Sequence, residues 1–379
     1  MRFVSDAGNT LPAIVVAFVA AAALSLILTP IVRRRAVLLG VVDRPNHRRV
    51  NLNPVPRGGG LAMGSAFLLV ALILVVANDR LRIIGAPTGL EPGDLVALLG
   101  GSAAAVAIGA LDDWFDLRAR WQLIGQLLLA VAAIVLGVEI VSVNNPFTSG
   151  LMRFTEPFAA GFTLLWVVGM INSVNFIDGL DGLSSGIGVI AAITLGVLSL
   201  TNQVDQPFVA VLCFALAGSL LGFLRWNFHP ATVFPGSSGT TFVGFALAVL
   251  SILGEAKVAV ALLVLGVPII DAFWIIVRRV WAGRSPFSPD RGHLHHRLLD
   301  LGLSHRQTVV LIYTICIGLG VLSLILSGVS QVYAFLGVFV GIGLLLLFIA
   351  GDGFGDAALE AESYPDKDRG ASAERVTPR

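Results

Sequence analysis

Three aspartates form a short cluster that could bind a divalent cation. Asp112, Asp113 and Asp116 stand at the end of a long apolar segment. The C-terminal end of a helix dipole disfavours negative charge, so a bound cation, a basic partner from another loop or solvation must offset it. We favour a cation or a basic partner over solvation alone.

A second polar cluster has a regular spacing of three residues. Asn172, Asn175, Asp178 and Asp181 follow this spacing, and Gly179 and other residues without charge separate them. Residues three apart are neighbours on a helix surface. Their oxygen atoms suit Mg²⁺. Asn, Asp and Gly also end helices and form turns, but four residues in one register favour a magnesium site.

Two glycine-containing loops could bind phosphate groups. Arg57 lies in Pro-Val-Pro-Arg-Gly-Gly-Gly, where the guanidinium can pair with a phosphate and the glycines allow the backbone to approach it. The loop from Asn227 to Gly239 precedes an apolar segment and could present N–H groups to an anion at a helix start. Membrane anchoring by arginine and an ordinary turn are the respective alternatives.

Three histidines form the last polar cluster. His293, His295 and His296 stand beside Arg291 and Arg297. Three imidazoles could hold zinc, but neighbouring cations oppose a metal ion and favour a phosphate. We therefore predict anion binding, with a metal site and a simple surface cluster as alternatives.

Apolar segments must position these clusters. Of 379 residues, 56% are hydrophobic and 13% are charged, whereas soluble domains have about 25% charged residues. Continuous apolar runs without alternation favour membrane helices over a barrel. The sequence predicts an all-α, polytopic integral membrane protein with about eleven transmembrane helices, at residues 11–32, 59–77, 94–111, 121–139, 157–171, 183–201, 206–224, 236–254, 256–277, 308–327 and 331–350.

The distribution of basic residues predicts the orientation. With the N-terminus outside, the loops on the inner side and the C-terminal tail hold 20 of the 25 Lys and Arg residues. Basic residues accumulate in cytoplasmic loops, so we expect the C-terminus and every polar cluster on the cytoplasmic side. Residues 1–350 would form the transmembrane catalytic domain and 351–379 a disordered cytoplasmic tail. Asp271 is expected to face the bundle interior, and Cys213 and Cys316 are expected to be buried without a disulfide.

In combination, the motifs resemble those of the polyprenyl-phosphate N-acetylhexosamine-1-phosphate transferase family, glycosyltransferase family 4. The branch that transfers N-acetylglucosamine 1-phosphate from UDP-N-acetylglucosamine to undecaprenyl phosphate is more similar than the peptidoglycan-precursor branch. The resemblance extends from Leu39 to Tyr313 and is carried by Val-Asp-Arg-Pro-Asn, Pro-Arg-Gly-Gly-Gly, Leu-Asp-Asp, Asn-Phe-Ile-Asp-Gly-Leu-Asp-Gly, Asn-Phe-His-Pro-Ala and Pro-Asp-Arg-Gly-His-Leu-His-His-Arg-Leu.

The resemblance implies a reaction and its partners. Sugar 1-phosphate, most simply N-acetylglucosamine 1-phosphate, would pass from a UDP-N-acetylhexosamine to an undecaprenyl or decaprenyl phosphate with release of UMP. This would be the first membrane step of cell-envelope glycan synthesis, at a multi-pass protein of the plasma or inner membrane. Mg²⁺, or Mn²⁺ in its place, would be the cofactor. No nucleic acid partner is expected, and the many Gly and Ala residues in the spans permit a homodimer without requiring one.

The resemblance also assigns site residues. Asp112, Asp113 and Asp178 would be catalytic, the first two positioning or deprotonating the lipid phosphate. Asp181 and Ser237 would be metal ligands. The substrate-binding residues would be Arg57, Asn172, Asn175, Asn227, His293, His295, His296 and Arg297.

Ser237 departs from the family pattern. Members usually have a metal-binding Asp after Gly236, and a serine hydroxyl can ligate Mg²⁺ but brings no charge. The departure is compatible with a catalytically impaired member that keeps a binding role, with a rearranged site in which Asp178 or water substitutes, or with an introduced substitution. A transporter or flippase using Asp271 is a further alternative from another class.

Overall fold

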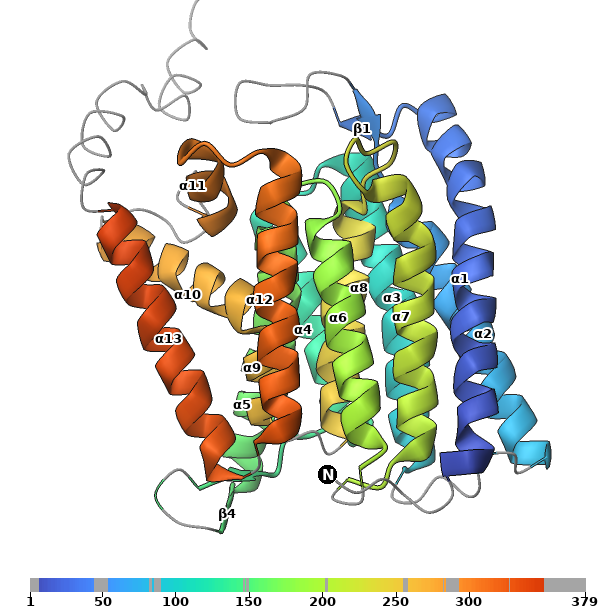
Figure 1. The fold of residues 1–379 in the computed structure, drawn as a ribbon. Helices are drawn as coiled ribbons and strands as arrows, with labels where there is room; N and C mark the ends of the chain where they lie inside the picture. The colour runs from blue at the N-terminus through green and yellow to red at the C-terminus, as the bar shows by residue number, and fades with distance from the viewer. Residues whose placement is uncertain are drawn as a thin grey trace, which may run out of the picture.

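The computed structural model describes residues 7–43, 54–81, 84, 90–145, 147, 150–201, 204–254, 258–281, 283, 293–326 and 328–350. Over these residues the chain is mostly helical, with two short antiparallel ribbons (Figure 1). This confirms the predicted helical architecture. The expected tail at 351–379 lies outside the described residues.

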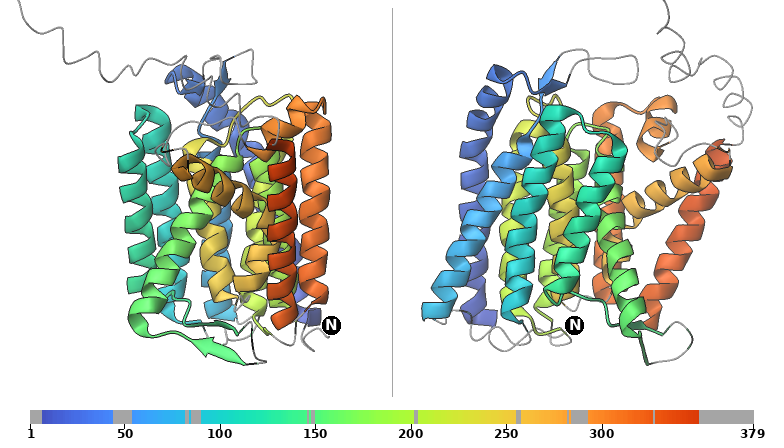
Figure 2. Two further views of the ribbon diagram at one scale, coloured as in Figure 1. Left: turned by 90° about the vertical axis from the view of Figure 1, so that its left-hand side faces the viewer. Right: turned by 180° about the vertical axis from the view of Figure 1, so that it is seen from behind.

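The first eight helices form the main bundle. Helix α1 packs along α7, whereas α3 and α5 pack against α8 (Figures 1 and 2). The ribbon β1–β2 connects α1 to α2, and the ribbon β3–β4 connects α4 to α5. The elements are α1 Ala7–Leu38, β1 Val42–Asp43, β2 Val55–Pro56, α2 Gly59–Leu81, α3 Pro92–Phe115, α4 Ala119–Val135, β3 Ser142–Asn144, β4 Leu151–Arg153, α5 Glu156–Ile177, α6 Leu183–Ser199, α7 Pro207–Asn227 and α8 Gly236–Leu253.

Seven of the described helices are long and apolar enough to cross a membrane, namely α1, α2, α3, α5, α7, α8 and α12. Three shorter apolar stretches lie in α4, α6 and α13. A 17-residue helix such as α4 or α6 is only about 26 Å long, somewhat less than a hydrocarbon core of roughly 30 Å. These helices are consistent with a polytopic membrane protein, while the number eleven stays a prediction.

The C-terminal helices differ from the sequence expectation at one place. A single span was predicted at 256–277, but the structure divides this segment at Leu265, and α10 tilts away from the bundle (Figures 1 and 2). Pro268 stands in the first turn of α10, where its missing N–H is tolerated. The bounds are α9 Val258–Val264, α10 Gly266–Trp281, α11 Leu294–Asp300, α12 His305–Ile325 and α13 Val329–Ala350.

The connecting segments separate into two groups at the two ends of the bundle. The β1–β2 ribbon, the α7–α8 loop and α11 lie at one end, whereas the β3–β4 ribbon lies at the other (Figure 1). Helix α1 begins at the end that carries β3–β4, and α13 ends at the opposite end (Figure 1). The structure therefore gathers the polar clusters at a single end, as the sequence predicted.

Glycines allow the start of α8 to enter the centre of the bundle. A Cβ on Gly60 would lie 2.1 Å from the backbone nitrogen of Gly239, and a Cβ on Gly109 would lie 2.3 Å from the carbonyl oxygen of Ser237. Helices α2 and α3 thus contact the first turn of α8 backbone to backbone. This contact brings the end of α3, with its aspartates, beside the N-terminus of α8.

Candidate active site

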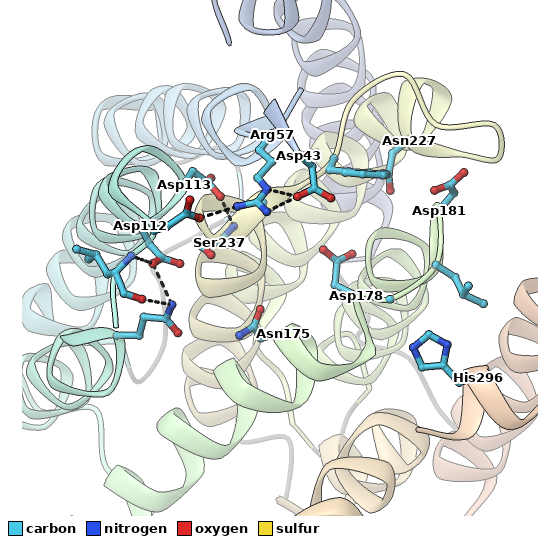
Figure 3. Close-up of a pocket in the computed structure, with 17 residues that line it drawn as sticks. Asp43, Arg57, Asp112, Asp113, Asn175, Asp178, Asp181, Asn227, Ser237 and His296 are labelled. Atoms are coloured by element: carbon cyan, nitrogen blue, oxygen red, sulfur yellow. Dashed lines mark hydrogen bonds and ion pairs between the residues drawn. The ribbon is translucent and has the colours of Figure 1, made fainter. Parts of the chain in front are cut away.

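A cavity of about 480 Å³ opens at the end of the bundle where the polar clusters gather (Figure 3). It contains nine of the thirteen site residues predicted from the sequence. Asp112, Asp113 and Ser237 stand on one side of the view and Asp181 and His296 on the other (Figure 3). The predicted residues that line it are Arg57, Asp112, Asp113, Asn175, Asp178, Asp181, Asn227, Ser237 and His296.

The carboxylate of Asp113 caps the N-terminus of α8. It accepts hydrogen bonds from the backbone nitrogens of Ser237, at 2.7 Å, and Ser238, at 3.1 Å, and from Ser238 Oγ at 2.7 Å. The first N–H groups of a helix lack intrahelical partners, and the helix dipole favours an anion there. The left-handed backbone of Gly236, with φ of +68°, brings the chain into this position. The cost of a negative charge at the end of α3 is therefore offset by α8.

The side chain of Asp112 is held by hydrogen bonds from residues that follow it, between α3 and α4 and in α4. Its Oδ1 accepts hydrogen bonds from the backbone nitrogen of Leu117 and from Gln122 Nε2, both at 2.9 Å. Gln122 also donates to the carbonyl oxygen of Leu117. These contacts fix the carboxylate at the turn between α3 and α4, facing the cavity.

Arg57 bridges two carboxylates across the mouth of the cavity. Its Nε and Nη2 donate to Asp43 Oδ1, the former at 2.9 Å, and its Nη1 donates to Asp116 Oδ1 at 3.1 Å (Figure 3). Asp43 is almost fully buried, whereas Asp116 is exposed. The β1–β2 ribbon supplies both Asp43 and the segment that leads to Arg57. Asp43 was not among the predicted site residues, although it lies in the Val-Asp-Arg-Pro-Asn motif.

Among the described carboxylates outside the candidate membrane spans, Asp178 has the most strongly shifted pKa. Burial, followed by the nearby carboxylates of Asp113 and Asp181, raises the pKa of Asp178 to about 7, and a hydrogen bond from Ser184 Oγ opposes the rise. Asp178 follows α5 directly, so the end of this helix points the side chain into the cavity. A cavity in which carboxylates disfavour each other's charge attracts cations.

The asparagines of the predicted stripe do not all reach the cavity. Asn175 lines it and accepts a hydrogen bond from Thr240 Oγ1 at 3.3 Å. Asn172 does not line it, because its Nδ2 donates to Gln126 Oε1 at 2.6 Å and to the carbonyl oxygen of Val168. Helix α5 turns by about 100° per residue, so side chains spaced three residues apart point in successively different directions around the helix.

Asn227 fixes the loop between α7 and α8. Its Nδ2 donates to the carbonyl oxygen of Val233 at 3.1 Å, and its Oδ1 accepts from Ser185 Oγ at 2.9 Å. The side chain is buried at the cavity wall. These bonds hold the loop that leads to Ser237.

The histidine segment is anchored by an acid from α10. Asp271 Oδ2 lies 2.8 Å from His293 Nδ1, and its Oδ1 accepts from the backbone nitrogen of Leu294 at 2.8 Å. Asp271 is 1% exposed, which confirms that it faces the interior. Its role as an anchor was not predicted, because the two residues are 22 positions apart in the sequence.

The rings of the three predicted histidines lie beside one another, those of His293 and His295 stacked and that of His296 tilted, and of the three only His296 lines the cavity. Burial, and then the neighbouring histidines, hold the pKa of His295 well below its usual range, so its ring is neutral. His295 contacts Gly179, where a Cβ would lie 2.1 Å from Nε2. Arg297 lies in α11 and does not line the cavity.

Asp181 directs its carboxylate towards a different set of residues. Its Oδ2 lies 2.7 Å from His229 Nδ1 and accepts a hydrogen bond from the backbone nitrogen of Ala231 at 3.0 Å. His305, the first residue of α12, stacks on His229 with ring centroids 4.2 Å apart. Neither imidazole was predicted as a site residue, because His229 and His305 come from separate segments. His229 in Asn-Phe-His-Pro-Ala was the available signal.

The helices, several of them candidate membrane spans, and the acidic cavity define a multi-pass membrane protein with a charged site at one end. A family model described as glycosyl transferase family 4 matches residues 95–255.

The chain also resembles named bacterial proteins over most of its length. It is 37% identical to a probable undecaprenyl-phosphate N-acetylglucosaminyl 1-phosphate transferase of Bacillus subtilis, over 80% of this chain and 82% of the relative. It is 34% identical to a decaprenyl-phosphate N-acetylglucosaminephosphotransferase of Mycolicibacterium smegmatis, over 91% of each chain. An undecaprenyl-phosphate alpha-N-acetylglucosaminyl 1-phosphate transferase of Escherichia coli is 29% identical over 74% of this chain and 75% of its own. The chain belongs to glycosyl transferase family 4, which confirms the resemblance read from its motifs.

Proposed function

We propose that this protein transfers N-acetylglucosamine 1-phosphate from its UDP-activated form to a polyprenyl phosphate and releases UMP. The observation that carries the proposal is the cavity in which Asp112, Asp113, Asp178 and Arg57 meet from separate segments at one end of the bundle. The names of the relatives supply the acceptor lipid and the sugar phosphate. The UDP carrier comes from the resemblance of the motifs.

The reaction needs little covalent assistance from the protein. A phosphate oxygen of the lipid would attack the sugar-linked phosphorus of the donor and form a new P–O bond. The bond from that phosphorus to the bridging oxygen would break, and UMP would leave with that oxygen and its electron pair. Because nucleophile and leaving group are both phosphates, positioning and charge neutralisation supply most of the acceleration.

Asp178 is the best-suited proton acceptor in the cavity. The last proton of a phosphate monoester has a pKa near 6, and the pKa of Asp178 is raised to about 7. Asp113 already accepts three hydrogen bonds and Asp112 two. We therefore assign Asp178 to receive the acceptor's proton, and Asp112 and Asp113 to position charge around the lipid phosphate.

The donor set of the cavity fits Mg²⁺ or Mn²⁺. Carboxylate and hydroxyl oxygens are suitable ligands for these ions, and Asp113, Asp178 and Ser237 all line the cavity. We propose that Asp113 and Ser237 hold the ion together with water, which leaves Asp178 free to accept the proton. Asp181, also predicted as a ligand, could contribute through Oδ1, since its Oδ2 already faces His229 and Ala231. When bound, the ion would neutralise negative charge on the two reacting phosphates.

The nucleotide sugar would bind at the side of the cavity formed by the histidine segment. His296 lines this side together with Asn227 and Gly179. His293, His295 and Arg297 would support it from α11 and the residue before it. The cavity would face the cytoplasm, because the loops at its end of the bundle belong to the side that carries 20 of the 25 Lys and Arg residues.

Release of UMP by the purified protein tests the function. The assay contains UDP-N-acetylglucosamine, polyprenyl phosphate and Mg²⁺, and compares the natural chain with Ser237→Asp, Asp113→Asn and Asp178→Asn. We expect transfer by the natural chain, and half-maximal transfer at a lower Mg²⁺ concentration in Ser237→Asp. Asp113→Asn and Asp178→Asn should each lower the transfer rate by at least about 100-fold, the scale expected for acid–base and charge-stabilising groups.

The same assay separates the alternatives. Activity only in Ser237→Asp would identify an impaired family member with a binding role. No transfer by either protein, under conditions in which a relative from Bacillus subtilis is active, would contradict the proposed function.

A further inference from the structure

Three side chains at the edge of the cavity form a cluster in which the proposed transfer reaction uses neither histidine and leaves Oδ2 of Asp181 unassigned. Asp181 comes from the turn after α5, His229 from the α7–α8 loop and His305 from the start of α12. One ligand atom from each residue lies within 4.8 Å of the other two. Neither His229 nor His305 lines the cavity.

We propose that Asp181, His229 and His305 form a site for a transition-metal ion of the Zn²⁺ class. The site is distinct from the Mg²⁺ proposed in the cavity, because imidazole nitrogens suit zinc and its neighbours, whereas Mg²⁺ takes oxygen ligands. Three protein ligands leave a fourth position for water.

The charge and geometry of the cluster favour a cation over an anion. Asp181 is 5% exposed and supplies a carboxylate among the imidazoles, which would repel a phosphate. Ligand atoms around tetrahedral zinc are about 3.4 Å apart, given metal–ligand bonds of about 2.0–2.1 Å. Small side-chain movements would bring atoms within 4.8 Å to this spacing.

The state of His305 is the second observation. Both of its ring nitrogens are shielded from solvent, and neither has a hydrogen-bond partner among the described residues. Buried polar atoms normally have a partner, and a metal ion would supply one. His229, which is 38% exposed, gives the ion a route from solvent.

The ion would hold three cytoplasmic segments together. Asp181 and the residues before it line the cavity, as does Asn227, two positions before His229. Arg306 Nη2 already donates to the carbonyl oxygen of His229 at 3.2 Å, so α12 and the α7–α8 loop are in contact without the ion. Asp181, in the turn after α5, already contacts His229 and Ala231, so metal binding would strengthen the link between the three segments and fix one wall of the cavity.

Zinc binding to the chelator-treated full chain in detergent, with excess Mg²⁺ present, tests the site. We expect one equivalent of Zn²⁺ to bind, and His305→Asn and His229→Gln each to weaken this binding by at least about 100-fold. His296→Gln is the matched control and should bind zinc as the natural chain does. Saturable binding that is lost in His296→Gln but retained in His305→Asn would move the site to the histidine segment and overturn the proposal.

X-ray absorption at the zinc edge keeps the proposal testable if a variant fails to fold. The natural chain should give two imidazole ligands and at least one oxygen ligand. Three imidazoles, or no saturable zinc binding, would contradict the site. Neither measurement uses nucleotide or lipid, so failure here is separate from failure of the transferase assay.

Discussion

The carboxylates in the cavity differ in the hydrogen bonds that they accept from the protein. Asp113 is bound by the start of α8 and Asp112 by Gln122 and Leu117, whereas Asp178 has one hydrogen bond, from Ser184. Hydrogen-bond donors stabilise the charged form, and burial with neighbouring acids destabilises it. In the proposed mechanism, these different partners suit Asp112 and Asp113 to positioning and Asp178 to proton transfer.

The acidity of Asp178 makes a prediction about stability and pH in the absence of metal. Its pKa is about 7 in the folded protein and near the ordinary aspartate value of 3.8 in the unfolded chain. Folding therefore takes up a proton between these values, so the ionised side chain destabilises the fold increasingly as pH rises to 7 and fully above it. Asp178→Asn removes this penalty.

We expect Asp178→Asn, in EDTA, to have a higher unfolding temperature than the natural chain at pH 8. The difference should shrink as the pH falls towards 5. Thermal unfolding in detergent followed by tryptophan fluorescence measures it. Asp205→Asn, an exposed site at the far end of α6, is the control with the same chemical change. An equal and pH-independent effect of both substitutions would show that burial of Asp178 is not responsible.

At the scale of elements, the site depends on how closely α3 and α2 approach α8. Gly109 contacts the backbone of Ser237 and Ser238, and Gly60 contacts Gly239. Without these glycines the start of α8 would be displaced from Asp113. The helix-capping interaction is therefore a product of helix packing, and loop sequence alone does not create it.

Two substitutions in α3 should have opposite effects on stability. Gly109→Ala places a Cβ within 2.3 Å of a backbone oxygen, which should destabilise the protein by about 1–3 kcal/mol. Gly100→Ala meets nothing within 4 Å and should stabilise α3 by up to about 1 kcal/mol. Unfolding temperatures of the two purified variants check this. Equal behaviour would mean that the backbone contact with α8 is not tight.

At the scale of the whole molecule, all polar clusters lie at one end of the bundle, and the membrane separates this end from the other. Asp300 ends α11 and Asp205 lies in the α6–α7 connection, and both are exposed. These two segments lie at opposite ends of the bundle (Figure 1). Cys213 and Cys316 are fully buried, which confirms the expectation from the sequence. The natural thiols therefore should not react with bulky reagents.

A membrane-impermeant maleimide tests the orientation in intact spheroplasts. Asp205→Cys should be labelled without permeabilisation, and Asp300→Cys only after it. The natural chain should remain unlabelled and serves as the control. The reverse pattern would place the cavity outside the cell and remove access to cytoplasmic UDP-sugars.

The sequence by itself determined the helical membrane architecture, the family and most of the residues around the cavity. Apolar length and motif composition are local properties, so segments such as 206–224 and the Asp178–Asp181 motif could be identified without coordinates. The break in the predicted span at 256–277 could not be located, because an apolar run reads the same whether the helix is continuous or divided.

Only the tertiary structure decided which partner each polar group takes. It directed Asp113 to α8, Asp271 to His293, and Asp181 to His229 and His305. It also turned Asn172 towards Gln126, away from the cavity that Asn175 lines. These pairings join residues that are 22 to 124 positions apart or lie on successive turns of one helix. These pairings depend on helix packing, which brings distant parts of the backbone into contact. Spacing along the chain carries no information about that packing.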